Sequence, residues 1–139
     1  MPSNALVPFF TDNETITATA QGAITGKRFV KFVVGGRGGL PTVATADATT
    51  RANAVACYDQ ADGQTLPIQL RNCVPVTAGE DLLAGDRIKS DAQGRAVKIA
   101  AATEGDEDNP ATPGEDHLAI GVVYVNTPAG SDAPINLTF

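Results

Sequence analysis

Apolar and polar residues alternate along much of the chain in short runs, a pattern typical of β-strands. The strongest run is residues 28–34 (RFVKFVV), which is rich in β-branched and aromatic residues. The same pattern predicts strands at residues 16–20, 54–58, 66–70, 73–76, 87–89, 96–99, 120–125 and 134–139. Strands about ten residues apart, with Gly and Pro turns between them, indicate an all-β fold, either an antiparallel barrel or a sandwich.

The segments between these strands carry turn signals. Residues 91–94 (DAQG) predict a hairpin turn. Residues 35–39 (GGRGG) predict a flexible surface loop with Arg37 exposed at its tip, and not a phosphate-binding loop, because Leu and Pro follow instead of Lys and Ser or Thr. Residues 42–52 mix Ala, which favours helix, with Thr and Val, which favour strand or loop. We expect a loop there with at most one helical turn.

The first fifteen residues differ from the rest of the chain. Two prolines and the absence of helical periodicity predict an extended N-terminal arm over residues 1–15, followed by a single β domain over residues 16–139. The arm carries a run of apolar residues, namely Leu6, Val7, Pro8, Phe9 and Phe10. Such side chains are costly to expose, so the arm is expected to dock either on this protein's own sheet or on a neighbouring subunit.

Length and charge narrow the function classes. The 139 residues suit one compact domain. The net charge of −6 argues against nucleic acid or an anionic membrane as the main partner, because phosphate groups are bound by Lys and Arg. The start of the chain lacks the pattern of a signal peptide, and no run approaches the roughly 20 apolar residues of a membrane span. We therefore expect synthesis in a cytoplasm, where thiols stay reduced.

Candidate chemistry is sparse. Cys57 and Cys73 could pair, but two reduced and partly buried thiols are the preferred interpretation. His117 is the only histidine and lies beside the acidic residues 103–116, where a solvated side chain is expected. That segment predicts an exposed loop. Its central carboxylates are Glu104, Asp106, Glu107 and Asp108. They lack the ligand spacing of a calcium-binding loop, so a solvated acidic loop is preferred to a Ca²⁺ site. We expect no catalytic, metal or cofactor site, and no enzymatic activity.

A family resemblance is carried by residues 74–98, VPVTAGEDLLAGDRIKSDAQGRAVK. They resemble the pattern V-x-V-x-A-G-x-x-(I/L)-x-x-G-D-x-(V/I)-x-x-D-x-x-G-(R/K)-A of small tailed-phage capsid decoration proteins, also called cement proteins. The turn-forming positions of this motif are Gly79, Gly85, Asp86 and Gly94, and the glycines supply turn geometry that other residues resist. AITGKRFVKF, TRANAVACYDQADGQTLPIQL and HLAIGVVYVNTPAGSDAPINLTF resemble other segments of these proteins in the same order.

The resemblance implies a compact β-barrel or β-tulip-like domain with an extended arm. It also implies a homotrimer on the outer surface of a phage capsid, at three-fold and quasi-three-fold positions, that stabilises the shell. The implied partners are the major capsid protein and further copies of this chain, with no nucleic acid, membrane or cofactor. The loop at residues 103–116 is longer than the resemblance implies, and the GGRGG segment is not part of the family pattern.

Two other classes of protein fit the sequence less well. A virion-borne β-sandwich that binds a host-surface glycan or receptor would present Trp or Tyr platforms, whereas this chain has no Trp and only Tyr58 and Tyr124. A peptidase-like β-barrel would need a nucleophile beside a base, and no such pair is evident in the sequence. The decoration protein is the preferred hypothesis.

Overall fold

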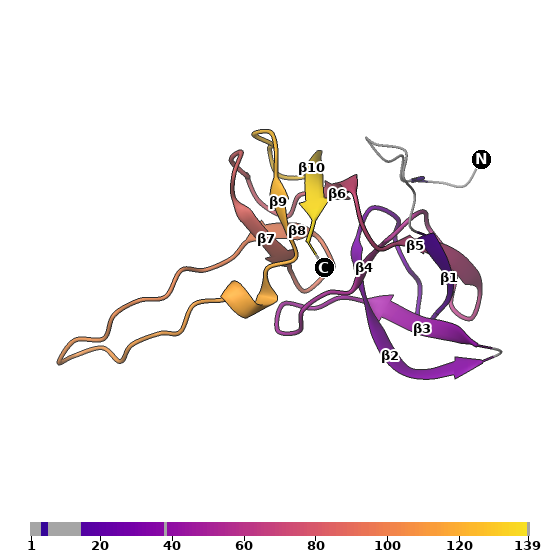
Figure 1. Cartoon of the computed structure of the whole chain (residues 1–139), viewed down its shortest axis with the longest axis horizontal. Helices are drawn as coiled ribbons and strands as arrows, with labels where there is room; N and C mark the ends of the chain where they lie inside the picture. Colours follow the sequence, from indigo (N-terminus) through magenta and orange to yellow (C-terminus); the bar gives the residue numbers. More distant parts are fainter. Residues whose placement is uncertain (1–3, 6–14, 38, 139) are drawn as a thin grey trace.

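The computed structural model describes residues 4–5, 15–37 and 39–138, so most of the expected N-terminal arm, including residues 6–10, lies outside the described residues. The first half of the described chain forms a closed five-stranded barrel in the order β1-β3-β2-β4-β5 (Figure 1). Its strands are β1 (Thr15–Ala20), β2 (Phe29–Arg37), β3 (Leu40–Thr45), β4 (Ala54–Ala56) and β5 (Thr65–Gln69).

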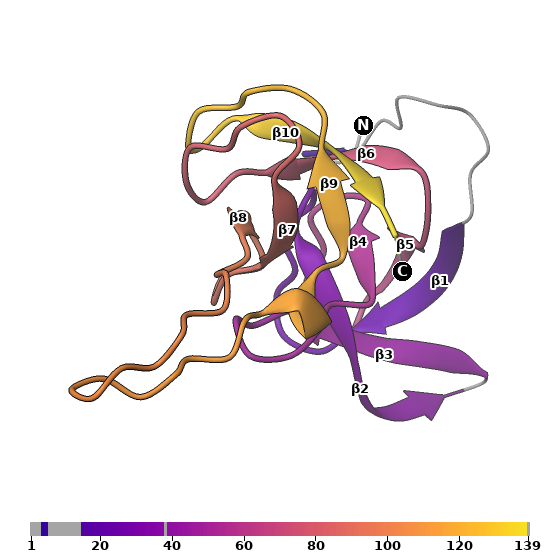
Figure 2. The ribbon, with the colours of Figure 1, turned by 60° about the vertical axis from the view of Figure 1, so that its left-hand side comes forward.

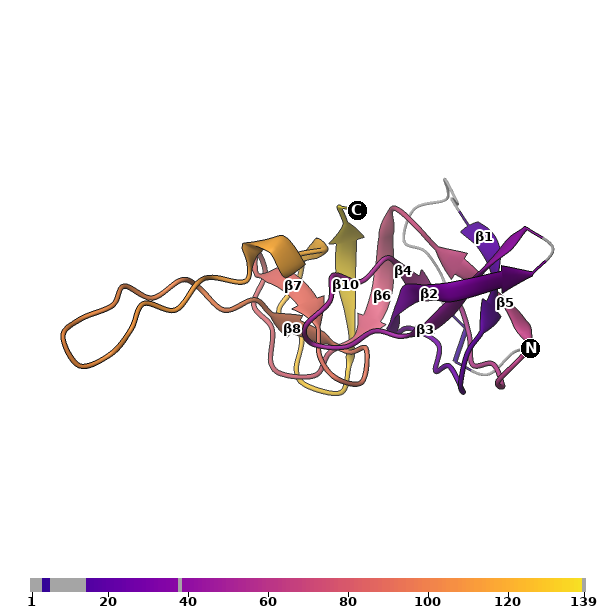
Figure 3. The ribbon, with the colours of Figure 1, turned by 90° about the horizontal axis from the view of Figure 1, so that it is seen from below.

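The second half forms a five-stranded antiparallel sheet in the order β6-β10-β9-β7-β8. Its strands are β6 (Cys73–Thr77), β7 (Arg87–Ser90), β8 (Ala96–Lys98), β9 (Gly121–Val123) and β10 (Asp132–Leu137). Past the end of β6, a bridge between Ala78 and Ala96 joins the two outer strands of the sheet, so the sheet curls back on itself. The barrel and this sheet lie side by side in two views (Figure 1 and Figure 3).

The all-β fold with a barrel confirms the expectation from the sequence. The described residues contain one helix, the single 3₁₀ turn η1 (Asp116–Leu118). The pairing is not uniformly antiparallel, however. Thr19 and Ala20 of β1 pair in parallel with Thr42 and Val43 of β3, which closes the barrel. A parallel contact needs a crossover connection, here the passage through β2, and such long-range pairing leaves no local sequence signal.

The apolar interior is divided into two clusters. One fills the barrel, and the other lies between the barrel and the second sheet. Strand β2 serves both because successive side chains of a strand point to opposite faces: Val30 enters the barrel cluster and Phe29 enters the shared cluster, and neither is exposed to solvent. Tyr58 packs against both clusters. The shared cluster also takes Ala46, Ala52, Val55 and Cys57 from the first half of the chain, and Val74, Val76, Ile88, Ile120, Val123 and Ile135 from the second.

The expectation of a loop at residues 42–52 is wrong for its first part, which belongs to β3. Strand β3 pairs with β2 on one edge and with β1 on the other. Those partners satisfy backbone groups that would otherwise need a helix or water, so tertiary pairing overrides the helical preference of the alanines. The part after Thr45 is a loop, in which Asp47 Oδ1 accepts hydrogen bonds from the backbone N–H groups of Thr49 and Thr50.

Three other boundaries also differ from the sequence prediction. The GGRGG segment does not end the strand, because β2 continues through Arg37 and pairs there with Leu40. Strand β9 ends at Val123, which leaves Tyr124 and Val125 exposed in a loop. The β-structure at 66–76 breaks between β5 and β6, where Asn72 has a φ of 79° and the chain passes from the barrel to the second sheet.

Candidate interaction surfaces

The recognised turn motif packs the β7–β8 hairpin against the barrel. Gly94, in the turn between β7 and β8, has a φ of +78°, and a Cβ there would lie 2.8 Å from the carbonyl oxygen of Phe29. That close approach allows the backbone N–H of Phe29 to donate a 2.7 Å hydrogen bond to the Gly94 carbonyl. The hairpin turn therefore joins the second sheet to the first residue of β2.

Gly79 also contacts the β7–β8 hairpin closely. Its backbone N–H donates to the carbonyl of Ala96, and a Cβ at this position would lie 2.6 Å from Oδ2 of Asp91. Asp91 organises the turn itself: Oδ1 accepts the backbone N–H groups of Gln93 and Arg95, and Oδ2 accepts from Nε of Arg95 at 2.8 Å. A side chain at residue 79 would displace this carboxylate.

Gly85 and Asp86 form part of a surface that we call the loop end, made of residues 79–86 and 124–131. These two loops lie beside each other at one end of the second sheet (Figure 1 and Figure 2). Leu82 and Thr127 exchange two backbone hydrogen bonds, and the N–H of Gly85 donates to the carbonyl of Val123. Three large apolar side chains are exposed here, namely Leu83, Tyr124 and Val125 at 60%, 50% and 56%.

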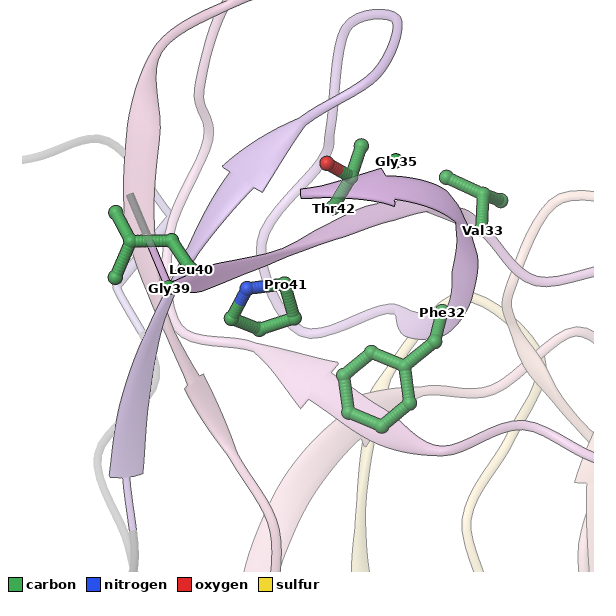
Figure 4. A pocket seen from close by; sticks show the side chains of 7 residues that line it. All are labelled: Phe32, Val33, Gly35, Gly39, Leu40, Pro41 and Thr42. Carbon is green, nitrogen blue, oxygen red and sulfur yellow. The ribbon is translucent and has the colours of Figure 1, made fainter. Parts of the chain in front are cut away.

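A second apolar surface lies on the β2–β3 hairpin. An open groove of about 540 Å³ runs along this hairpin. Figure 4 shows the side chains that line it, which are Phe32, Val33, Gly35, Gly39, Leu40, Pro41 and Thr42. Beyond Val30, β2 has no further strand partner on its β4 side among the described residues, although the N–H of Phe32 donates to Oδ1 of Asn53. Phe32 is 45% exposed and Val34 is fully exposed.

The acidic segment projects away from the body of the molecule as a long narrow loop (Figure 1 and Figure 3). Residues 100–113 are all exposed, and the backbones of Thr103 and Thr112 pair to hold the two sides of the loop together. Its base is fixed by Glu115, whose Oε2 lies 2.5 Å from Nζ of Lys89 and whose Oε1 accepts the N–H of Ala100. The hydrogen bond from Lys89 and the bond from Ala100 lower the pKa of the Glu115 carboxyl.

The residues singled out as possible reactive groups are dispersed. Cys57 and Cys73 are buried free thiols, and desolvation raises the pKa of Cys57 to about 11 and also raises the pKa of Cys73. At neutral pH both thiols therefore remain protonated and weakly nucleophilic. His117 is exposed on η1. Within the described residues, no group of three or more His, Cys, Asp or Glu side chains is placed to hold a metal ion.

The described part of the chain contains no helix long and apolar enough to cross a membrane.

The start of the chain bonds to its own barrel. Nδ2 of Asn4 donates to the carbonyl of Gly26 at 2.6 Å, and Oδ1 of Asp59 accepts the Gly26 N–H at 2.8 Å. Gly26 has no room for a side chain, because a Cβ would lie 2.6 Å from Cα of Tyr58. On the other side of residues 6–14, Thr15 pairs with Gln69 of β5.

Sequence reasoning did not identify the loop end or the hairpin groove as surfaces. Phe32 and Val34 occupy the side of β2 that points into the barrel at Val30, so period-2 reasoning assigns them to the core. They are exposed because the hairpin extends past the end of the barrel, which depends on how far the neighbouring strands reach. One available signal was the apolar character of residues 28–34 on both faces, which is unusual for a half-buried strand.

One solved structure with a similar fold is the head fiber gp8.5 N base of bacteriophage phi29. The two chains superpose with a TM-score of 0.65 at 18% sequence identity, over 96% of this chain and 94% of the other. At this identity the comparison establishes a shared fold. No protein-family model matches this chain, and a search of curated proteins finds no match. The structural neighbour is a phage head protein, in agreement with the sequence resemblance of residues 74–98 to phage-head proteins.

Proposed function

We propose that this chain is a non-enzymatic structural protein of a phage virion, which binds the outer surface of the capsid and stabilises the shell. The observation that carries this proposal is the end-to-end fold similarity to the base of a phage head fiber. Because nearly the whole of both chains is matched, the similarity concerns the complete architecture of barrel and second sheet and not a common small motif.

The surface of the molecule supports a binding role. Six large apolar side chains are conspicuously exposed on the described residues, and they are Ile16, Phe32, Val34, Leu83, Tyr124 and Val125. They lie on the barrel and at the loop end. Three of them belong to the loop end and two to the β2–β3 hairpin, and apolar side chains grouped in this way are typical of contact sites for other proteins. In a symmetric shell each contact is repeated many times, so modest individual contacts give tight attachment.

The proposal includes a homotrimer at three-fold and quasi-three-fold positions, with the major capsid protein as the partner. The N-terminal segment with Leu6, Val7, Pro8, Phe9 and Phe10 supplies one shell contact. Asn4 and Thr15, on either side of that segment, both bond to the barrel. Attachment of the segment to the shell would therefore bring the barrel directly against the capsid surface.

Co-sedimentation with phage heads that lack this protein tests the proposal, together with the mass in solution measured by light scattering. We expect the full chain to sediment with the heads, to raise their thermal stability and to have the mass of three copies. A chain lacking residues 1–12 should stay folded and fail to sediment. Phe9→Ser with Phe10→Ser is the matched variant, because it keeps Asn4. Full decoration by both variants would remove the arm from the proposal, and failure of the full chain to bind would overturn it.

A further inference from the structure

The exposed apolar residues of the loop end do not belong to the buried core clusters. Leu83, Tyr124 and Val125 each expose half or more of their surface, whereas the adjacent Leu82 and Val123 are buried. The buried neighbours anchor the two loops to the shared core, and the exposed residues are held outward by that anchoring. We propose that the loop end is a docking surface for a protein that presents an apolar recess flanked by Lys or Arg. Under the proposed function, on which this identification rests, that protein is the shell subunit.

The loop end is preorganised, which favours binding because little conformational entropy is lost on association. The N–H of Leu83 donates to Oδ2 of Asp86, and the N–H of Asp86 donates back to the carbonyl of Leu83. The N–H of Ala84 donates to Oδ1 of Asn126 on the other loop at 2.9 Å. These bonds fix the loop that carries Leu83 against the loop that carries Tyr124 and Val125. The Gly85–Asp86 turn of the recognised motif thereby acquires a role in presenting Leu83.

The charge of the loop end selects the kind of partner. Residues 79–86 and 124–131 contain three carboxylates, Glu80, Asp81 and Asp86, and no Lys, Arg or His. Each carboxylate also accepts a backbone hydrogen bond, from Lys98, Ala129 and Leu83 respectively, so the charges are held in place beside the apolar side chains. A partner with basic groups around its recess would complement this arrangement.

The same charges disfavour the loop end of a second copy as the occupant. Two loop ends in contact would bring six carboxylates together without a cation from residues 79–86 or 124–131, and like charges across an interface weaken association. The hairpin groove lacks this feature among its described lining residues, which are uncharged. The loop end is therefore assigned to the contact with the shell subunit.

Substitutions at the loop end test the assignment in the same co-sedimentation assay. Leu83→Glu and Tyr124→Glu should each weaken binding to heads by about tenfold or more, because a carboxylate would replace an apolar side chain that docking buries. Ala101→Glu is the control: it adds the same charge at an exposed position on the acidic loop, which is assigned to no contact, so this variant should bind as the unchanged chain does. Raising NaCl from about 50 mM to about 500 mM should weaken binding through screening.

The outcomes separate this inference from the proposed function. If the unchanged chain does not sediment with heads, the proposed function fails. If the chain binds and both loop-end variants bind equally well, the docking assignment is wrong while the function stands. A fall in oligomer mass for Tyr124→Glu would identify a second copy as the occupant and overturn the assignment. Unchanged circular dichroism and melting temperature of the variants would establish that lost binding does not reflect unfolding.

Discussion

At the scale of single residues, glycines and carboxylates determine the geometry of several turns. Gly79 and Gly94 allow backbone segments to approach more closely than any side chain would permit. Asp47 and Asp91 each accept several backbone N–H groups and also bind a nearby cation, Lys31 and Arg95 respectively. These residues stabilise turns through short-range contacts, so the effect of a single substitution on stability should measure the contribution of each contact.

Gly94→Ala should destabilise the protein more than Gly63→Ala does. Both glycines have φ close to +80°, so both substitutions incur the left-handed cost of about 1 kcal/mol. Gly63 has open space at the Cβ position, whereas Gly94 faces the Phe29 carbonyl at 2.8 Å. The steric clash should add about 1–3 kcal/mol to the loss of unfolding free energy for Gly94→Ala. Urea denaturation of both variants measures the difference, and equal losses would contradict the role assigned to Gly94.

The Lys31–Asp47 pair should make stability depend on acid. The Lys31 ammonium, 2.6 Å away, and the N–H groups of Thr49 and Thr50 hold the pKa of Asp47 far below its ordinary value of 3.8. A carboxyl with a depressed folded pKa stabilises the protein above about pH 4, and that stabilisation is lost as the pH falls further.

Asp47→Asn keeps a side-chain oxygen for the turn and removes the charge. Wild type should exceed this variant in stability at pH 7, and the gap should narrow between about pH 5 and pH 2.5. Chemical denaturation across this pH range measures the gap. Lys31→Met should reduce the same pH-dependent component; a gap that is constant with pH in both variants would show that the pair contributes none.

At the scale of elements, the projecting parts are separable from the fold. The acidic loop is exposed throughout residues 100–113 and is held at its base by Glu115. The β2–β3 hairpin also projects, but it emerges from strands that close the barrel. The acidic loop can therefore be removed without exposing the apolar core, whereas the β2–β3 hairpin cannot.

Replacing residues 102–112 with two glycines should therefore leave the melting temperature within about 3 °C of wild type, because few buried contacts are lost and a shorter loop is slightly cheaper to close. Glu115→Ala should have the larger effect, since it releases both Lys89 and Ala100. Differential scanning calorimetry measures both. A loss of more than about 5 °C on shortening the loop would mean that the loop packs on the body.

At the scale of the whole molecule, the shared cluster joins the barrel to the second sheet. Phe29, fully buried at the start of β2, is one of its largest members, and its N–H is bonded to the β7–β8 turn. The two sheets are consequently expected to unfold together and not as independent units.

Phe29→Ala should cost about 3–5 kcal/mol and should still give a single transition. Phe32→Ala, in the same strand but 45% exposed, should cost less than about 1.5 kcal/mol. In a Tyr124→Phe background, tyrosine fluorescence reports Tyr58, which packs against both clusters. This fluorescence and far-UV circular dichroism should give coincident urea transitions with and without Phe29→Ala. Two separated transitions would show that the halves unfold independently.

The sequence pattern and the structure agree on some of these features and differ on others. The sequence determined the all-β class, the hairpin turn at 91–94 and most strand cores, because these depend on β-branched runs and turn residues that act locally. It also contained the resemblance to phage-head proteins. It did not identify β3 as a strand, because its Thr- and Ala-rich residues become a strand only when β1 and β2 pair with both of its edges.

Only the tertiary structure decided the division into two sheets, the parallel closure between β1 and β3, and which apolar residues remain outside. Leu82 and Leu83 are adjacent and chemically identical, yet one is buried and the other exposed. The alternation of a strand tells which side chains share a face, but whether a face is covered depends on segments far away in the chain. That dependence is why the exposure of the apolar side chains at the loop end, on which the proposed docking contact rests, could not be read from the sequence.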